Sequence, residues 1–490
     1  MLSVCFVFAF AKAQSQKGYY NFTYNEDKGT IDLEVSQLDT EFLYVHSLTT
    51  GLGSNDIGLD RGQLGDGVVV KWMKSGNKLL LVQPNLSYRA TSDNVQERKS
   101  VEQAFARSVL YGFTIKETKG TTYTIDLTPF LLEDAHGIVE RLKARKEGTY
   151  KIDATRSVLW MENTKSFPKN TEFEAMLTFT GTPTGRNVRS VAPDPTAITV
   201  IQHHSFVELP EKGYEPRVFH PQSGSFYTSY MDYSAPVDED ITKRFITRHR
   251  LEKKDPTAAI SEAVEPIVYY LDPGTPEPVR TALLEGAAWW NDAFTSAGFK
   301  NAFQVKMLPT GADPMDLRYN VIQWVHRSTR GWSYGGSVID PRTGEILKGH
   351  VSLGSLRIRQ DFMIAQGLLK EPFKSSDTNS SAMLDMALAR IRQLSAHELG
   401  HTLGFAHNFA ASASDRASVM DYPHPYVKLV DGSIDLSDAY ATGIAAWDKL
   451  IVQYSYGAPV EPKKEKEYLN ETLERMKASG IAFITDSDAR

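Results

Sequence analysis

The chain of 490 residues has a single cysteine, Cys5, inside the apolar stretch Leu2–Ala11 at its N-terminus. The rest of the chain has none, so disulfide bonds are excluded there and stability must come from packing. Long apolar runs are missing as well. Leu2–Ala11 is the only stretch apolar enough to enter a membrane, and it is too short to cross one. The sequence therefore predicts no integral membrane span.

The N-terminal stretch has features of an export signal. It ends in Ala11-Lys12-Ala13, which matches the A-x-A pattern of a cleavage site, although no basic residue precedes the apolar run. We predict a signal peptide over residues 1–13, cut after Ala13. The mature protein would then lie in the periplasm, on the cell surface or outside the cell.

The net charge of −6 gives no reason to expect nucleic acid or an anionic membrane as a partner. The sequence does not indicate an oligomeric state.

Residues 397–407 read His-Glu-Leu-Gly-His-Thr-Leu-Gly-Phe-Ala-His. On a helix, His397 and His401 are four residues apart and share one face, so both imidazoles can reach one metal ion. Glu398 lies about 100° further round the helix, where it can hold a water molecule beside the metal. Gly404 permits the chain to leave the helix in a sharp turn, so that His407 can return as the third ligand. Three nitrogen ligands leave a fourth position open, as in catalytic zinc sites. The alternative is a buried helix with ordinary core histidines.

Together with Ser418-Val-Met-Asp-Tyr422, this motif resembles the metzincin class of zinc endopeptidases, whose pattern is H-E-x-x-H-x-x-G-x-x-H followed by a methionine turn. Other segments resemble a family of secreted bacterial zinc-dependent metalloproteases: Arg244–Pro256, Pro266–Asp272 and Asp340–Ile346. That family couples an uncharacterised N-terminal domain to a metzincin-like catalytic domain. Its members usually continue past the point where this chain stops, which implies that the protein extends beyond Arg490.

The fold class that we predict is α+β, with a β-rich accessory domain followed by a metzincin-like α/β domain. Short alternating segments such as Thr30–Val35, and the pair Val68–Trp72 and Lys78–Val82, predict strands in the first part. In the second part, a helix from Pro278 and an active-site helix from about Ser380 to Leu403 are expected. The predicted divisions are a signal peptide at 1–13, the accessory domain at 17–181, a connecting segment at 182–262, the catalytic domain at 263–460, and a C-terminal helix with the truncation point at 461–490.

The resemblance implies one catalytic Zn²⁺ ion, held by His397, His401 and His407, with Glu398 as the general base for peptide-bond hydrolysis. Met420 is expected beneath the metal, packed against the histidine rings without binding the ion. 

Tyr422 matches a tyrosine that in some metzincins helps to bind the oxyanion or acts as an extra ligand; alternatively, it only packs under the helix. A strand that pairs with extended substrate is expected at the rim of the cleft, and Val351-Ser352-Leu353 is our candidate.

Two features near the motif remain open. Asn408 differs from the residue that usually follows the third histidine in the best-known metzincins, so the substrate preferences of those enzymes do not apply to this chain. A structural role for Asn408 would be a hydrogen bond to the returning loop. Partners must also orient the ligand imidazoles, and Asp421 and Asp415 are the candidates.

The leading hypothesis is a secreted zinc endopeptidase that acts on proteins or peptides. One alternative is a surface protein that binds protein or glycan and carries a degenerate or latent peptidase domain, but the intact Glu398 argues against degeneracy. Another is a zinc hydrolase that acts on a non-peptide amide. Since the mature chain has no cysteine, latency through a thiolate on the zinc is excluded.

Overall fold

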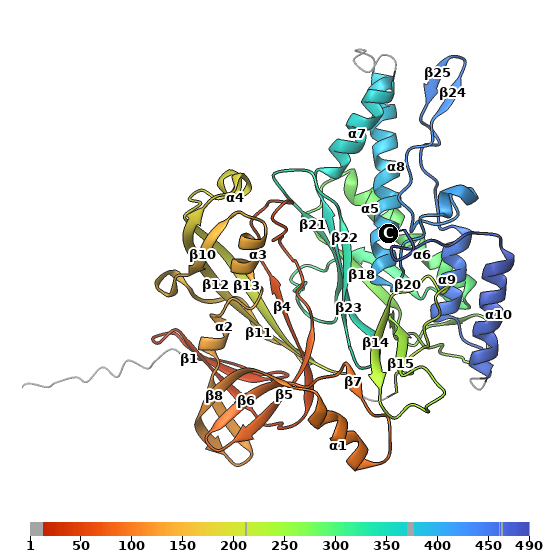
Figure 1. Cartoon of the computed structure of the whole chain (residues 1–490). Helices are drawn as coiled ribbons and strands as arrows, with labels where there is room; N and C mark the ends of the chain where they lie inside the picture. Colours follow the sequence, from red (N-terminus) through yellow and green to blue (C-terminus); the bar gives the residue numbers. More distant parts are fainter. Residues whose placement is uncertain (1–12, 211–212, 370–376, 460, 462–463, 490) are drawn as a thin grey trace, which may run out of the picture. The chain divides into compact units, whose positions relative to one another are not determined.

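The computed structural model describes residues 13–210, 213–369, 377–459, 461 and 464–489. The chain forms two compact units (Figure 1). Unit 1 runs to Asn85 and resumes over Lys99–Pro210, whereas unit 2 comprises Leu86–Arg98 and Glu211–Arg490. The predicted signal peptide lies outside the described residues except for Ala13. Among the residues described, no helix has the length and apolar character needed to cross a membrane.

Unit 1 is built on one antiparallel sheet of twelve strands, in the order β1-β2-β3-β9-β8-β6-β5-β4-β13-β12-β10, with β11 also paired to β12. The alternation in Thr30–Val35 has the expected effect, because Ile31, Leu33 and Val35 are all buried. The predicted hairpin is formed by β5 and β6. These strands are β1 (Ala13–Gln16), β2 (Asn21–Asn25), β3 (Thr30–Val35), β4 (Glu41–Leu48), β5 (Val68–Ser75), β6 (Lys78–Gln83), β8 (Ser108–Lys119), β9 (Thr122–Asp126), β10 (Gly148–Ile152), β11 (Val158–Ser166), β12 (Asn170–Pro183) and β13 (Ala197–Glu208).

Short helices accompany this sheet. They are α1 (Val95–Ala104), α2 (Thr128–Leu131), α3 (Ile138–Ala144), α4 (Arg186–Val191) and the 3₁₀ turn η1 (Ala154–Arg156). The segment 182–262, expected as a connection, contributes β13 to unit 1 and the strands β14 to β17 to unit 2.

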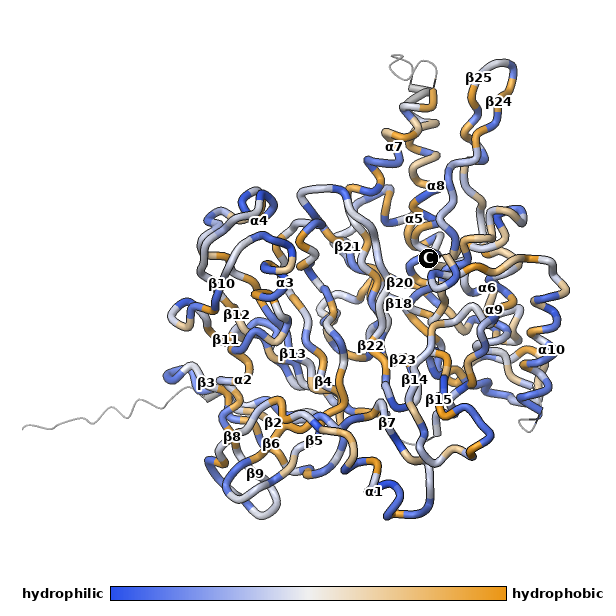
Figure 2. Tube along the Cα trace, viewed as in Figure 1, coloured by the Kyte–Doolittle hydropathy of each residue, from blue (hydrophilic) through white to orange (hydrophobic). Residues whose placement is uncertain are grey.

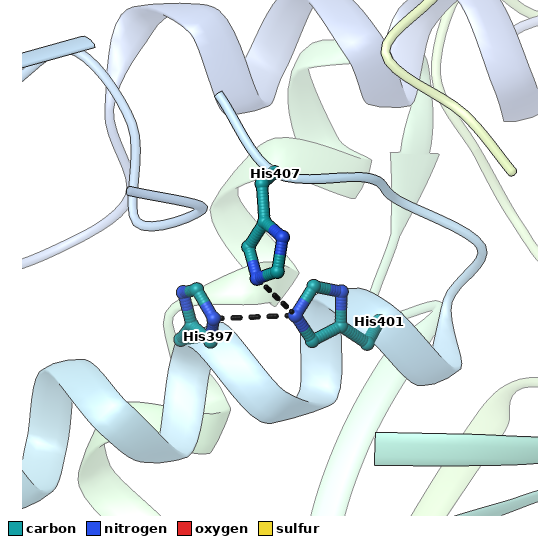
Figure 3. A group of neighbouring side chains, drawn as sticks. All are labelled: His397, His401 and His407. Atoms are coloured by element: carbon teal, nitrogen blue, oxygen red, sulfur yellow. Dashed lines mark hydrogen bonds between the residues drawn. The ribbon is translucent and has the colours of Figure 1, made fainter. Parts of the chain in front are cut away.

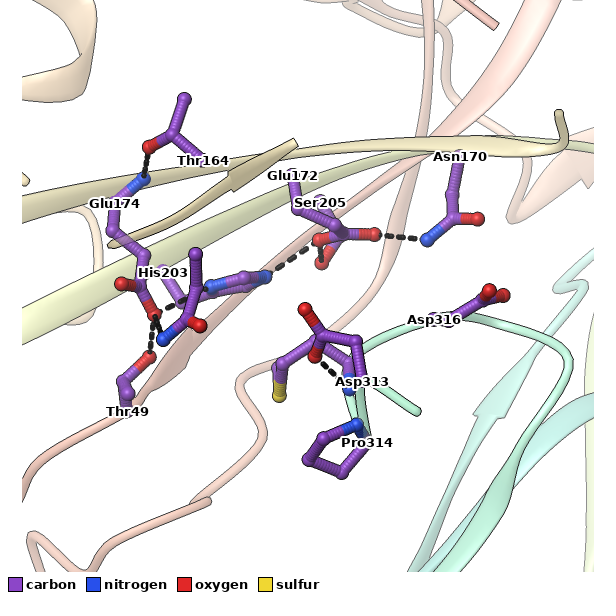
Figure 4. A network of polar contacts seen from close by, with 12 residues as sticks. Thr49, Thr164, Asn170, Glu172, Glu174, His203, Ser205, Asp313, Pro314 and Asp316 are labelled. Carbon is purple, nitrogen blue, oxygen red and sulfur yellow. Dashed lines mark hydrogen bonds and ion pairs between the residues drawn. The ribbon is translucent and has the colours of Figure 1, made fainter. Parts of the chain in front are cut away.

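A buried charged cluster lies on one face of β12 and β13 (Figure 4). His203 Nε2 donates to the Glu172 carboxylate at 2.6 Å, and its Nδ1 lies 3.2 Å from the Glu174 carboxylate. Burial disfavours the charge on His203, but the two carboxylates outweigh it and raise its pKa to about 9. His204 points to the opposite face, as expected for neighbours on a strand, and bonds the Tyr44 hydroxyl at 2.9 Å.

The main sheet of unit 2 has six strands in the order β16-β23-β21-β18-β20, with β22 also paired to β23. Only β22 is antiparallel to its neighbour, so the sheet is mixed. The strands of unit 2 are β7 (Tyr88–Arg89), β14 (Tyr227–Asp232), β15 (Thr242–Ile246), β16 (Arg248–His249), β17 (Ser261–Glu262), β18 (Ile267–Leu271), β19 (Phe299–Lys300), β20 (Phe303–Met307), β21 (Asn320–Val325), β22 (Tyr334–Ile339), β23 (Glu345–Gly354), β24 (Lys428–Val430) and β25 (Ser433–Asp435).

The helices of unit 2 supply most of its core together with the sheet. They are α5 (Val279–Ala288), α6 (Trp290–Ser296), α7 (Arg357–Leu368), α8 (Asp377–Thr402), α9 (Ala446–Tyr456), α10 (Glu465–Ala478) and the 3₁₀ turn η2 (Ala411–Ser414). Side chains of α5, α6, α8 and α9 share one cluster with Tyr269, Ile322 and Val351 of the sheet. The predicted fold class, α+β with a β-rich N-terminal part and an active-site helix, is confirmed.

One predicted helix differs in its course. The helix expected from Pro278 is interrupted at Trp289, between α5 and α6, and its apolar side chains are buried. The helix α9 begins at Ala446, three residues after Gly443, which has a left-handed conformation with φ +89°. Most of the trace along α10 is hydrophilic (Figure 2), as expected for a charged surface helix.

Candidate metal centre

The C-terminal end of α8 presents two histidines of the motif, and the chain beyond it returns the third (Figure 3). The reversal occurs at Gly404, which has φ +98°, and a Cβ atom there would lie 2.0 Å from the Thr247 carbonyl oxygen. Only glycine fits this position. His401 Nε2 lies 3.2 Å from His397 Nε2 and 3.1 Å from His407 Nε2. The helical spacing and the glycine thus bring the three predicted ligands together.

The opposite nitrogen of each ring has an acceptor of its own. His397 Nδ1 donates to the Val419 carbonyl at 2.8 Å, and His401 Nδ1 donates to the Phe405 carbonyl at 2.8 Å. His407 Nδ1 bonds the Asp486 carboxylate at 2.8 Å. Because a carbonyl oxygen can only accept, the protons of the first two rings must sit on Nδ1. Their Nε2 lone pairs then face the shared point.

These residues fit a zinc ion. A tetrahedral ion about 2.0–2.1 Å from each nitrogen separates its ligands by about 3.3 Å, close to the observed Nε2 spacings. Burial, followed by the charge of the neighbouring histidines, lowers the pKa of His397 far below its usual range and that of His401 to about 4. Both rings are therefore neutral, which is the form that binds metal. A cation bound between the three Nε2 atoms would satisfy these lone pairs.

Glu398 lies beside the triad and is 4% exposed. Its carboxylate accepts the Gly335 backbone N–H from β22. Burial raises the pKa of Glu398 to about 8, opposed by the charge of the buried Arg390 and by the Gly335 bond. A divalent cation at the histidines would favour the ionised form again.

Met420 is fully buried, and its sulfur lies against the active-site helix. The contact that places its sulfur is with Gly400, where a Cβ atom would be 2.2 Å from Sδ. The motif glycine therefore allows the methionine to approach the helix.

The methionine turn is held by a residue that the sequence analysis did not single out, Asp448. Its buried carboxylate accepts from the Ser418 hydroxyl at 2.6 Å and from the Val419 N–H at 3.0 Å. Since the Val419 carbonyl receives His397 Nδ1, Asp448 fixes the turn that orients this ligand. Asp448 occupies the N3 position of α9, where acidic residues are common; nothing in its local sequence links it to the turn.

Two aromatic rings border the histidines. The Tyr422 ring centroid lies 5.1 Å from that of His397 and 4.7 Å from that of His407, and the side chain is 54% exposed. Phe226 stacks on His401 at 5.7 Å, and its N–H bonds the Gly404 carbonyl. Phe226 lies in the predicted connecting segment, and only its spatial position reveals it.

The prediction that Val351-Ser352-Leu353 forms the free strand at the rim is wrong. These residues pair with β21 on one side and with β22 on the other, and all three are buried. Among the described strands, β22 has β23 as its only partner. Because the Gly335 N–H reaches Glu398, the open edge of β22 faces the general-base candidate. Among the described strands, β22 and not Val351–Leu353 thus combines an unpaired edge with a contact to Glu398.

Neither aspartate proposed as a partner of the ligand imidazoles has that role. Asp421 accepts from the backbone N–H groups of Ser412 and Tyr422, and so closes the turn itself. Asp415 is exposed, in a left-handed conformation with φ 55°. The partners are instead two carbonyl oxygens and Asp486.

Comparison with known families agrees with this site. Residues 379–490 match a family model described as Met-zincin, and residues 62–254 match one described as a domain of unknown function (DUF5117). Searches among curated proteins and among solved structures gave no match. The histidine cluster and the Met-zincin match define a zinc-binding peptidase domain of the metzincin class. Residues 379–490 thus carry a Met-zincin domain, and a domain of unknown function precedes it, as the resemblance implied.

The contact between β22 and α8 predicts the effect of an added methyl group. A Cβ atom at Gly335 would lie 2.3 Å from the Glu398 carbonyl oxygen and 3.1 Å from His401 Cβ. We expect Gly335→Ala to lower the free energy of unfolding by about 1–3 kcal/mol in urea titrations, because backbone must move. The matched control is Gly336→Ala on the same strand, where nothing lies within 4 Å; its change should stay below about 0.5 kcal/mol. Equal effects of the two substitutions would contradict the contact.

Proposed function

We propose that the protein is an exported zinc endopeptidase that hydrolyses peptide bonds in proteins or peptides, with Glu398 as the general base. One observation carries the proposal. Three imidazoles converge on a single point at the ligand spacing of zinc, and the buried Glu398 directly follows the first of them on the same helix. The Met-zincin match supports the same reading.

His397, His401 and His407 would hold one Zn²⁺ ion. When bound, this ion supplies a Lewis acid and lowers the pKa of water at its open position to about 7. The oxygens bonded to the three Nδ1 atoms keep the rings oriented, so that the ligands are preorganised.

Glu398 would accept a proton from the attacking water and pass it to the leaving amine. Its carboxylate is held by the Gly335 N–H and is shielded from solvent, so its position relative to α8 is fixed. 

Tyr422 would stabilise the oxyanion. Its ring lies against two of the ligand imidazoles and half of the side chain is exposed, so the phenol can reach substrate at the metal. A phenolic O–H donates to a developing negative charge, which is a large term in acyl-transfer catalysis.

The open edge of β22 would bind the substrate backbone. An extended peptide can pair with an exposed strand edge, and Gly335 places this edge beside Glu398. A substrate that pairs along a strand does not need to place its own terminus in the site. This mode of binding therefore favours cleavage within a chain over removal of terminal residues. The alternative of a binding protein with a degenerate domain gains no support, since the ligand set and Glu398 are intact.

Glu398→Gln tests the role of the general base. We expect this variant to bind one zinc ion per chain, as the wild type does, while cleavage of a denatured protein falls by about 100- to 10,000-fold. Zinc is measured by mass spectrometry of metals and cleavage by gel assay. The control is Glu474→Gln, an exposed residue of α10 that should leave both unchanged. A wild type that folds without zinc would refute the proposal, and zinc without peptide cleavage would favour the binding protein or the non-peptide hydrolase.

Tyr422→Phe separates the two possible roles of Tyr422. If its hydroxyl donates to the oxyanion, Tyr422→Phe should lower kcat by about 100-fold and leave zinc affinity unchanged. Tyr426→Phe, at an exposed tyrosine four residues away, serves as the control. An unchanged kcat for Tyr422→Phe would mean that the ring only packs against the histidines.

The proposal that the protein is exported rests on the apolar stretch Leu2–Ala11 and on the Ala11-Lys12-Ala13 pattern. N-terminal sequencing of the protein from its producing cells should begin at Gln14. A mature protein that retains Leu2–Ala11 would contradict cleavage.

A further inference from the structure

A segment near the end of the chain docks onto the loop that carries the third histidine. The Phe409 N–H donates to the Ile484 carbonyl at 2.8 Å, and Asn408 Nδ2 donates to the Ala482 carbonyl at 3.0 Å. The Ile484 N–H returns a bond to Asn408 Oδ1 at 3.2 Å. We call Ala482–Asp486 the docking segment. Three bonds fix its register on this loop.

Apolar contacts hold the same segment in place. The Phe483 ring stacks on the buried Trp447 of α9, with centroids 5.1 Å apart and planes at 20°. Phe483 and Ile481 both pack against the main core of unit 2. The docking segment is therefore attached to the core as well as to the loop.

The docking segment ends at the metal centre. Asp486 Oδ2 lies 2.8 Å from His407 Nδ1. His397 and His401 donate to backbone carbonyls, so His407 is the one ligand of the three that a side chain orients, namely the Asp486 carboxylate. A carboxylate acceptor makes a stronger bond than a carbonyl and raises the basicity of the ligand ring.

We propose that the docking segment is a built-in support for the third ligand, in which Asp486 positions His407 and Asn408 positions the segment. This inference rests on the proposed zinc site. It also gives a physical reason for Asn408. The position after the third histidine must donate to the Ala482 carbonyl and accept from the Ile484 N–H, and an amide can do both, whereas a carboxylate can only accept.

The test is a measurement of zinc affinity by competition with a chromophoric chelator, starting from metal-free protein of the full chain. We expect Asp486→Ala to raise the zinc dissociation constant by about 10- to 100-fold, with a smaller rise for Asp486→Asn, which keeps an acceptor oxygen. The Asp486 side chain is 49% exposed, so neither substitution should prevent folding. Asp488→Ala is the matched control, since it removes the same charge from a nearby residue whose carboxylate accepts from the Thr485 N–H and does not bond His407.

A second variant tests the role of Asn408. Asn408→Asp replaces the donor with a carboxylate that faces the Ala482 carbonyl, and it should weaken zinc binding to a similar degree by releasing the docking segment. The two substitutions act on one unit, so the double variant should lose less affinity than the product of the single losses. In the Co²⁺-substituted protein, both variants should alter the visible absorption spectrum, whereas Asp488→Ala should not.

The outcomes are distinguishable from those that test the proposed function. If the wild type binds zinc but Asp486→Ala binds it equally tightly, the positioning role is refuted while the zinc site stands. Fully multiplicative losses for Asn408→Asp and Asp486→Ala would refute the coupling through the docking segment. A wild type that binds no zinc would refute the zinc site itself.

Discussion

The structure depends on one electrostatic constraint, which is that three imidazole nitrogens point their lone pairs at the same place. Lone pairs at separations near 3 Å repel one another unless a cation lies between them. The protein maintains this arrangement by giving the far nitrogen of every ring a partner. Each partner comes from a different part of unit 2: the methionine turn for His397, the residue after Gly404 for His401, and the docking segment for His407.

These three supports are themselves held by buried polar contacts. The Val419 carbonyl that receives His397 belongs to a turn whose N–H is bonded to Asp448, at the start of α9. Trp447, the residue before Asp448, stacks on Phe483 of the docking segment. A single turn of α9 thus stabilises the supports of two of the three ligands. In the part of the chain that the structure describes, the triad is the one cluster of three metal-ligating side chains.

Unit 1 shows how a chain without disulfides buries charge. Glu172 and Glu174 bracket His203 inside the sheet, so each charge has a hydrogen-bonded partner of opposite sign. Its cores consist of aromatic and aliphatic side chains from an antiparallel sheet. The catalytic candidates all lie in unit 2, whereas the match to a domain of unknown function covers residues 62–254, which belong partly to unit 1 and partly to unit 2.

The sequence by itself determined the features that follow from local geometry. Two histidines four residues apart share a helix face in any helix, and Gly404 is needed wherever the chain reverses so sharply, so the ligands could be read from their spacing. Alternation likewise predicted the strands of unit 1. Only the tertiary structure decided which strand has an open edge, because Val351–Leu353 and β22 differ in their neighbours and not in any local pattern. It also decided the partners of the ligand rings. Val419 and Asp486 lie 22 and 79 residues from their histidines. The local sequence around Asp486 does not distinguish it from other surface aspartates, and its role follows only from the packing of the docking segment against Asn408 and Trp447.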